Sequence, residues 1–221
     1  MRGIVSFLFV SLAAASAAAA APLSVVTVAA PAINCKFDPS CKITVTDTVA
    51  NFTLPGATGN AFLQSRTFPV GKPGTAGAGK YAYEYRLDLT QLVGVVAAPC
   101  VTQLKLTFGP VVSLNYDSRG GVEQVFVTTV GGLGTVAPSS VDKTGNVVTF
   151  NFNTPVCAGS SPGKGDTSYF FGLASNQSAH AVTATVLSSP GGSLSLSARA
   201  PKLLISPPPG GLKPRPRPPG R

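Results

Sequence analysis

The stretch that decides the fold class of this chain is residues 80–89, KYAYEYRLDL. Large apolar side chains occupy every second position, and small or charged side chains lie between them. Because successive side chains of a β-strand point to opposite faces, this period of two predicts a half-buried strand. Its core face carries Tyr81, Tyr83, Tyr85, Leu87 and Leu89, and its other face carries Ala82, Glu84, Arg86 and Asp88.

The same alternation recurs on both sides of this stretch. Further strand candidates, separated by Gly, Pro and Asn turn signals, are 42–49, 61–70, 101–108, 111–116, 122–130, 147–152, 168–173, 181–187 and 193–198. So many short strands with almost no helical periodicity predict an all-β fold, an antiparallel β-sandwich of jelly-roll or Ig-like type. A closed barrel fits the same pattern. The one helix that the pattern allows is a short one within 88–97.

The N-terminus has the build of a secretory signal peptide. Arg2 precedes the apolar run 4–12, and residues 13–21 are nearly all alanine. We expect cleavage around residues 18–20, with a second possible site near residue 30. An uncleaved membrane anchor fits less well, because a span needs roughly 20 strongly apolar residues.

The chain is therefore expected to have four parts. These are a signal peptide at 1–20, an N-terminal extension with a local disulfide loop at 21–42, a β-sandwich domain at 43–201 and a disordered basic tail at 202–221. After leader cleavage no membrane span is expected. The location is then secreted or extracellular, or periplasmic if the source is Gram-negative.

Most of the formal charge of +9 comes from the tail. Residues 207–221, PPPGGLKPRPRPPGR, contain seven prolines, four basic residues and no acid, a composition typical of a solvated polyproline-II segment. The rest of the mature chain has no cluster of Lys and Arg, so a nucleic-acid partner is not expected. The tail is expected to attract an extracellular glycan or acidic cell-surface polymer weakly, or to serve only as a solubilising terminus.

Four cysteines in an exported chain predict disulfides rather than free thiols. Cys35 and Cys41 flank the turn-rich sequence KFDPS, which favours a local pair and leaves Cys100 and Cys157 to link distant segments. A zinc site would require CxxC-like spacing or several histidines. The sequence has neither, and we expect no cofactor.

A serine-hydrolase motif is present in outline. Residues 159–163 spell GxSxG, and Asp166 and His180 follow in hydrolase order, so that Ser161 would be the nucleophile, His180 the base and Asp166 the orienting acid. The motif requires a strand-to-helix turn, whereas Pro162-Gly163 is typical of a loop. We therefore favour a surface loop, and a surface position for His180, the only histidine.

Three other motifs are weak. Residues 74–80 match the start of a phosphate-binding loop, but Tyr81 stands where Ser or Thr is required, so 72–80 is expected to be a mobile Gly-rich loop without an apolar anchor. Asp117 and Glu123 are the best candidates for a calcium site. Asn51 and Asn176 begin glycosylation sequons, which matter only in a eukaryotic source.

The run YFFGLAS at 169–175, with 148–152 and Cys157-Ala158-Gly159 before it, resembles exported bacterial β-sandwich proteins of uncharacterised function. The resemblance covers roughly residues 40–200 and rests on structural rather than catalytic motifs. Many such proteins end in a membrane-sorting helix, whereas this chain ends in the Pro/Arg tail. The resemblance implies a fold and no activity.

The sequence thus predicts a secreted, non-catalytic binding or structural protein of unknown ligand. The first alternative is a carbohydrate-binding or adhesive module, which would present an exposed aromatic patch. The absence of tryptophan disfavours it. The second alternative is an extracellular hydrolase, which would bring polar groups together in a cleft.

Overall fold

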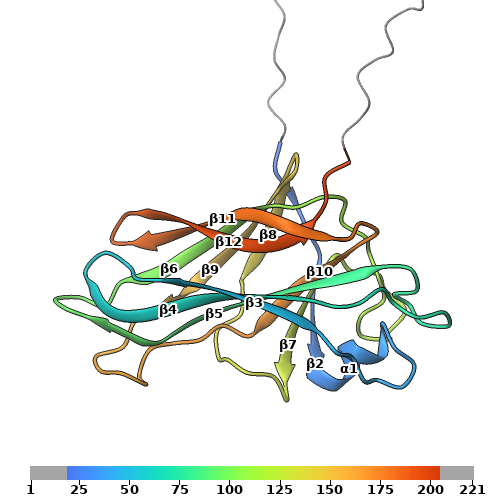
Figure 1. The fold of residues 1–221 in the computed structure, drawn as a ribbon, viewed down its shortest axis with the longest axis horizontal. Helices are drawn as coiled ribbons and strands as arrows, with labels where there is room; N and C mark the ends of the chain where they lie inside the picture. Colours follow the sequence, from blue (N-terminus) through green and yellow to red (C-terminus); the bar gives the residue numbers. More distant parts are fainter. Residues whose placement is uncertain (1–18, 205–221) are drawn as a thin grey trace, which may run out of the picture.

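The chain folds into two antiparallel-rich β-sheets of six strands each (Figure 1). The structure is a computed structural model that describes residues 19–204. The expected signal peptide lies almost wholly outside the described residues, as does the tail from residue 205. The fold is all-β, as predicted, with one short helix in the described part of the chain.

We name the two sheets A and B. In spatial order, sheet A consists of β1 (Ala21–Pro22), β8 (Ser140–Thr144), β9 (Val147–Cys157), β6 (Cys100–Thr107), β11 (Ala179–Ser189) and β12 (Ser193–Pro201). Sheet B consists of β2 (Val25–Ala29), β7 (Val125–Val130), β10 (Phe170–Ser175), β5 (Tyr81–Gly94), β4 (Ala57–Thr67) and β3 (Thr46–Phe52). All neighbouring strands are antiparallel except β2 and β7, which are parallel.

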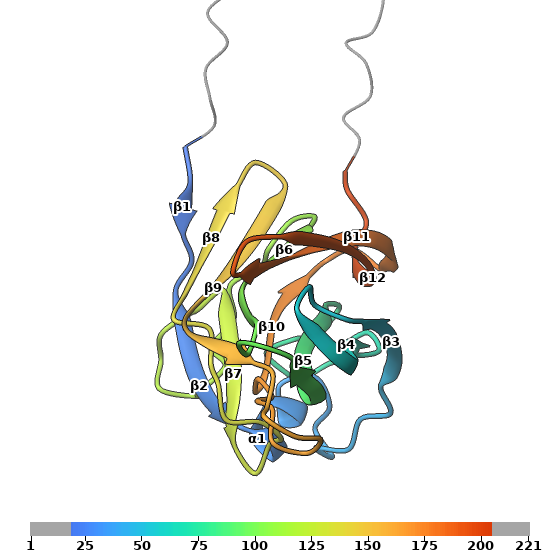
Figure 2. The same ribbon diagram turned by 90° about the vertical axis from the view of Figure 1, so that its left-hand side faces the viewer.

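The two sheets are joined along their edges. At one edge the chain runs from β1 in sheet A directly into β2 in sheet B (Figure 2). At the opposite edge β12 of sheet A contacts β3 and β4 of sheet B. The space between the sheets is thus bordered by strands on both sides.

The main core fills the space between the sheets. Tyr85 of β5 packs 6.0 Å from Phe150 of β9, and Phe150 packs 4.6 Å from Phe171 of β10, measured between ring centroids. The buried hydroxyls of Tyr83 and Tyr85 donate hydrogen bonds to the carbonyl oxygens of Gln177 and Arg199, at 2.6 and 2.7 Å. The tyrosine stripe therefore faces the core, as the alternation predicted.

Both disulfides pair as the sequence favoured. Cys100 and Cys157 are opposite each other on β6 and β9, within sheet A. Cys35 and Cys41 close a local loop after helix α1 (Ala30–Cys35).

The prediction that β5 is half-buried is wrong, because its outer face is also covered. Ala82 is 0% exposed and Glu84 is 2% exposed. A second apolar cluster lies on this outer face of sheet B, built from Val28, Ile33, Phe37, Phe68, Ala82, Leu114, Tyr116, Phe126 and Ala174. Ile33 and Phe37 come from residues 30–45, which we call the cover segment.

The N-terminal part of the chain therefore belongs to the fold. Residues 21–42, expected as an extension, contribute an edge strand to each sheet and part of the cover segment. The alternating sequence VVTVA of β2 was not recognised as a strand, because it follows the alanine-rich leader without a break in composition.

Three further details differ from the sequence prediction. No helix forms within 88–97, since β5 continues to Gly94. Residues 111–116 make isolated bridges, at Val112 and Leu114, rather than a strand. Strand β8 was missed because its sequence SVDKT carries only one large apolar side chain. Within residues 19–204 no helix has the length and apolar character needed to cross a bilayer.

Replacing both cysteines of the long-range disulfide should destabilise the protein most. The Cys100–Cys157 bond closes a separation of 57 residues and the Cys35–Cys41 bond one of 6. In the chain-entropy treatment we expect losses of roughly 4 and roughly 2 kcal/mol for the respective double serine variants. Equilibrium unfolding in urea measures the loss of unfolding free energy in both variants. Equal losses would contradict the expected dependence on loop length.

Candidate functional site

A hollow in the described surface lies over the outer face of sheet B. It is a cleft of about 420 Å³ between the sheet and the cover segment. Pro31, Ile33, Ile43 and Val45 of the cover segment form one wall, and the turn at 131–133 after β7 borders the cleft as well. The cleft floor is formed by Arg66, Glu84 and Phe170.

The charged part of this site is a row of three side chains in register across the sheet. Asp47 of β3 is opposite Arg66 of β4, and Arg66 is opposite Glu84 of β5. Arg66 donates to both carboxylate oxygens of Asp47, at 2.9 Å from Nε and 3.1 Å from Nη2. Its guanidinium also lies over the ring of Phe170, 4.3 Å from the centroid, a geometry that favours a cation–π contact.

Glu84 is the unusual member of the row. It forms an ion pair with Arg66, whose Nη1 is 3.7 Å from Oε2, a separation too long for a hydrogen bond. Burial raises the pKa of Glu84 to about 7, with Arg66 opposing the shift and Asp47 adding to it. A buried carboxylate without a donor is costly, so this group lacks a partner that its position calls for.

A glycine beside Glu84 shapes the sheet surface there. Gly172 of β10 is opposite Glu84, and a Cβ at this position would lie 2.7 Å from the ring of Phe126 and 2.2 Å from the carbonyl oxygen of Tyr83. The Phe126 ring therefore occupies the space that a side chain would need. Any larger residue at 172 would displace it.

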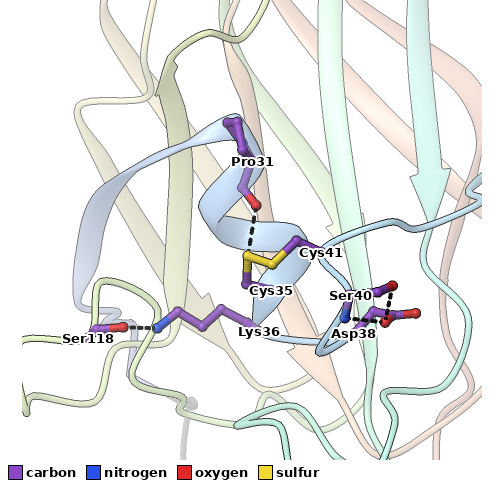
Figure 3. Close-up of a disulfide and its surroundings, with 7 residues drawn as sticks. All are labelled: Pro31, Cys35, Lys36, Asp38, Ser40, Cys41 and Ser118. Atoms are coloured by element: carbon purple, nitrogen blue, oxygen red, sulfur yellow. Dashed lines mark hydrogen bonds between the residues drawn. A yellow bond between two sulfur atoms is a disulfide. The ribbon is translucent and has the colours of Figure 1, made fainter.

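The disulfide loop supports the wall of the cleft (Figure 3). Asp38 accepts hydrogen bonds from the amide and hydroxyl of Ser40, at 2.8 and 2.7 Å, and pairs with Lys72. The hydrogen bond with Lys72, followed by those with Ser40, lowers the pKa of Asp38 to about 2. Cys41 itself lines the cleft. The disulfide thus holds a wall residue in place.

The Gly-rich loop 72–80 is held against this disulfide loop, so the prediction of a loop without an apolar anchor is wrong. Lys72 N donates to the Phe37 carbonyl at 2.8 Å, and Gly77 N donates to the Lys36 carbonyl at 2.7 Å. A Cβ at Gly77 would lie 2.5 Å from the Phe37 ring. Gly77, inside the stretch that resembled a phosphate-binding motif, thus allows close packing, and β5 rather than a helix follows this stretch.

The proposed hydrolase residues are not assembled. Asp166 accepts a hydrogen bond from the backbone N–H of Cys157 at 2.9 Å. Cys157 is opposite Cys100 of β6, and Cys100 is opposite Ser189 at one end of β11. His180 is at the other end of β11, nine residues earlier. At about 3.3 Å per residue this separation is on the order of 30 Å, so the triad hypothesis is wrong.

The remaining candidates also stay apart from the cleft. Asp117 accepts from Arg119 N at 2.8 Å, and Glu123 accepts from Tyr116 N at 3.4 Å. In the described part of the chain no three His, Cys, Asp or Glu side chains lie close enough together to hold a metal ion. His180 is half-buried rather than fully on the surface, with Nδ1 3.0 Å from the Ala200 carbonyl oxygen.

The alternation in residues 80–89 places Glu84 on the outer face of its strand, but nothing in the sequence gives this residue a role. The pattern does not show that the cover segment buries this face. On a solvated face a carboxylate needs no partner. The alternation of Ile43 and Val45 was noticed as part of a strand, whereas both side chains line the cleft.

Comparison of the chain with protein families, with curated proteins and with solved structures gave no match.

The buried carboxyl of Glu84 predicts an unusual dependence of stability on pH. Because the pKa of Glu84 is raised from 4.5 to about 7 on folding, its proton stabilises the folded state below pH 4.5, and this stabilisation is lost as the pH rises to about 7. Glu84→Gln should therefore gain stability relative to the wild type over this range, by up to roughly 3 kcal/mol. Urea unfolding from about pH 4.5 to pH 8 measures the difference, and parallel profiles for the two proteins would contradict it.

Proposed function

We propose that this chain is a secreted, non-catalytic binding protein that holds a small ligand in the cleft over sheet B. The observation that carries the proposal is the carboxyl of Glu84, which is 2% exposed, lines an open cleft and has only Arg66, at 3.7 Å, as a charged partner among the described residues. Buried polar groups in folded proteins nearly always have partners. A ligand with hydrogen-bond donors would supply the missing one.

The form of the cleft supports this proposal. Its volume of about 420 Å³ is within the usual range for small-molecule sites, roughly 300–1,000 Å³. Apolar side chains form most of its walls, and a few polar groups are gathered at its floor, which is the usual division of roles in such sites. The disulfide and the hydrogen bonds to loop 72–80 fix one wall, so the site is largely preformed.

Export is part of the same proposal. Two disulfides within one domain fit an oxidising compartment, and the leader at 1–20 has the required composition. Cleavage near residue 30 would remove β1 and β2 from the edges of both sheets, so we place it at 18–20. The assignment as a jelly-roll or Ig-like sandwich, and the resemblance to exported bacterial β-sandwich proteins, belong to this proposal as well.

The carbohydrate-binding alternative receives less support. Sugar platforms use exposed aromatic rings, whereas every Phe and Tyr among residues 19–204 is buried or half-buried. We retain one polymer interaction in the proposal, a weak attraction of the basic tail, 202–221, to acidic glycans.

A cleft-filling variant tests the binding function. Val45 lines the cleft, so Val45→Phe should obstruct it, whereas Val49→Phe places the same ring at a position that is 56% exposed and away from the lining. A thermal-unfolding screen of the mature, oxidised protein against amines, amino acids, sugars and organic acids should find compounds that stabilise the wild type and the Val49→Phe variant, by about 2.7 kcal/mol at a hundredfold excess over Kd. The Val45→Phe variant should not respond. A screen without any stabilising compound, or with equal responses from both variants, would refute the proposal.

The tail should act separately from the cleft. We expect the mature protein to bind an acidic polysaccharide column at low salt and to elute at moderate salt, because exposed charges are screened within about 8 Å at physiological ionic strength. Deletion of residues 202–221 should abolish this retention, and Val45→Phe should leave it unchanged. Salt-resistant retention of the truncated protein would instead assign polymer binding to the folded domain.

A further inference from the structure

We propose that the ligand of the cleft is a small primary amine, whose ammonium group pairs with Glu84 and whose apolar body packs along the wall formed by the cover segment. This inference rests on the proposed binding function and names its ligand class.

The charge of the floor favours a cation. One cation, Arg66, faces two carboxylates: it donates two hydrogen bonds to Asp47 and its Nη1 is 3.7 Å from Oε2 of Glu84. The row therefore has one surplus negative charge. The cover segment and β7 add no charged side chain to the described lining of the cleft. Their polar side chains there are Asn34 and Thr128. The empty floor therefore carries net negative charge whenever Glu84 is ionised.

The geometry of Arg66 argues against an anionic ligand. Its Nε and Nη2 are engaged by Asp47, and its plane lies against Phe170. Phe170 is also 5.5 Å from the guanidinium of Arg86, which pairs with Asp88 at 3.1 Å. Both arginines near the cleft thus already have carboxylate partners. A carboxylate or phosphate would have to displace one of them while approaching Glu84.

An ammonium group matches what Glu84 lacks. It has three N–H donors and a full charge, and hydrogen bonds between two charged groups are the short, strong ones. A neutral alcohol would offer one donor without charge. A divalent cation would need several oxygen ligands, whereas Glu84 is the only carboxylate in the lining.

The walls call for an apolar body on that amine. Ile33, Ile43 and Val45 face the cleft from the cover segment, and Leu133 faces it from the turn after β7 while remaining 60% exposed. Each methylene of a ligand that is buried against these side chains leaves water and favours binding. An amine with an aromatic or branched aliphatic body uses this surface, and a polyamine does not.

Binding of such an amine should strengthen as the pH rises. The charged groups that face Glu84 are Arg66 on the adjacent strand β4 and Asp47 on β3, one strand further. Since burial raises the pKa of Glu84 to about 7, its charge forms between pH 5 and pH 8, whereas an alkylamine remains protonated over this range. Glu84 is then the group whose ionisation controls affinity.

Isothermal titration of the mature, oxidised protein with three matched probes tests the inference. The probes are 2-phenylethylamine, 2-phenylethanol and 3-phenylpropionate, which present an ammonium, a hydroxyl and a carboxylate on similar bodies. We expect the amine to bind more tightly at about pH 8 than at about pH 5, and the other two probes to bind at least tenfold more weakly than the amine, about the effect of losing a buried charge partner. Glu84→Gln should weaken amine binding at pH 8 by at least roughly tenfold and remove its pH dependence.

A matched variant separates the carboxyl of Glu84 from general charge. Glu123 is the only other glutamate in the chain and does not line the cleft, so Glu123→Gln should bind the amine as the wild type does. Equal amine binding by Glu84→Gln, or equal binding of the alcohol, would overturn the amine assignment. The library screen could instead find a sugar or an organic acid that stabilises the wild type but not Val45→Phe. In that case the proposed binding function stands, and the assignment of an amine as the ligand is wrong. If neither the library nor the amine binds, both proposals fail.

Discussion

The removal of water from the outer face of sheet B is the constraint on which the rest of this structure depends. A strand at the centre of a two-sheet protein normally has one wet face, and β5 carries Glu84, Arg86 and Asp88 there. The cover segment dehydrates that face with Ile33, Phe37 and their neighbours. Charges that would be unremarkable in water then require partners, and the ion pairs on this face follow from that requirement.

These partners are distributed unevenly. Arg86 pairs with Asp88, whereas Arg66 serves both Asp47, at 2.9 Å, and Glu84, at 3.7 Å, so two cations meet three anions. Burial of an ion pair is at best weakly stabilising, and burial of an unmatched carboxyl is plainly unfavourable. The fold tolerates this cost because the main core between the sheets, with the rings of Tyr85, Phe150 and Phe171, lies on the other side of the same strands.

The sequence was sufficient for the fold class, the tyrosine face of β5 and the disulfide pairing, because each depends on local spacing. It was insufficient for the second face of β5. Whether Glu84 is solvated depends on residues 30–45, which are distant in sequence and which the proximity of the leader made look like an extension. The catalytic-triad hypothesis was wrong for the opposite reason. Ser161, Asp166 and His180 are close in sequence, but β11 carries His180 to the far end of its sheet.

The placement of the first strands has a consequence for the order in which the protein can fold. Within residues 19–204, β1 pairs only with β8, and β2 pairs only with β7, which ends at Val130. A chain that leaves the ribosome or crosses a membrane N-terminus first must therefore keep its leading strands unpaired until most of sheet B has followed. Such long-range closure is slow and exposes apolar edges in the meantime. The wall that completes the cleft is attached to these strands, so it is among the last parts to form, and no N-terminal fragment ending before β7 can contain the finished site.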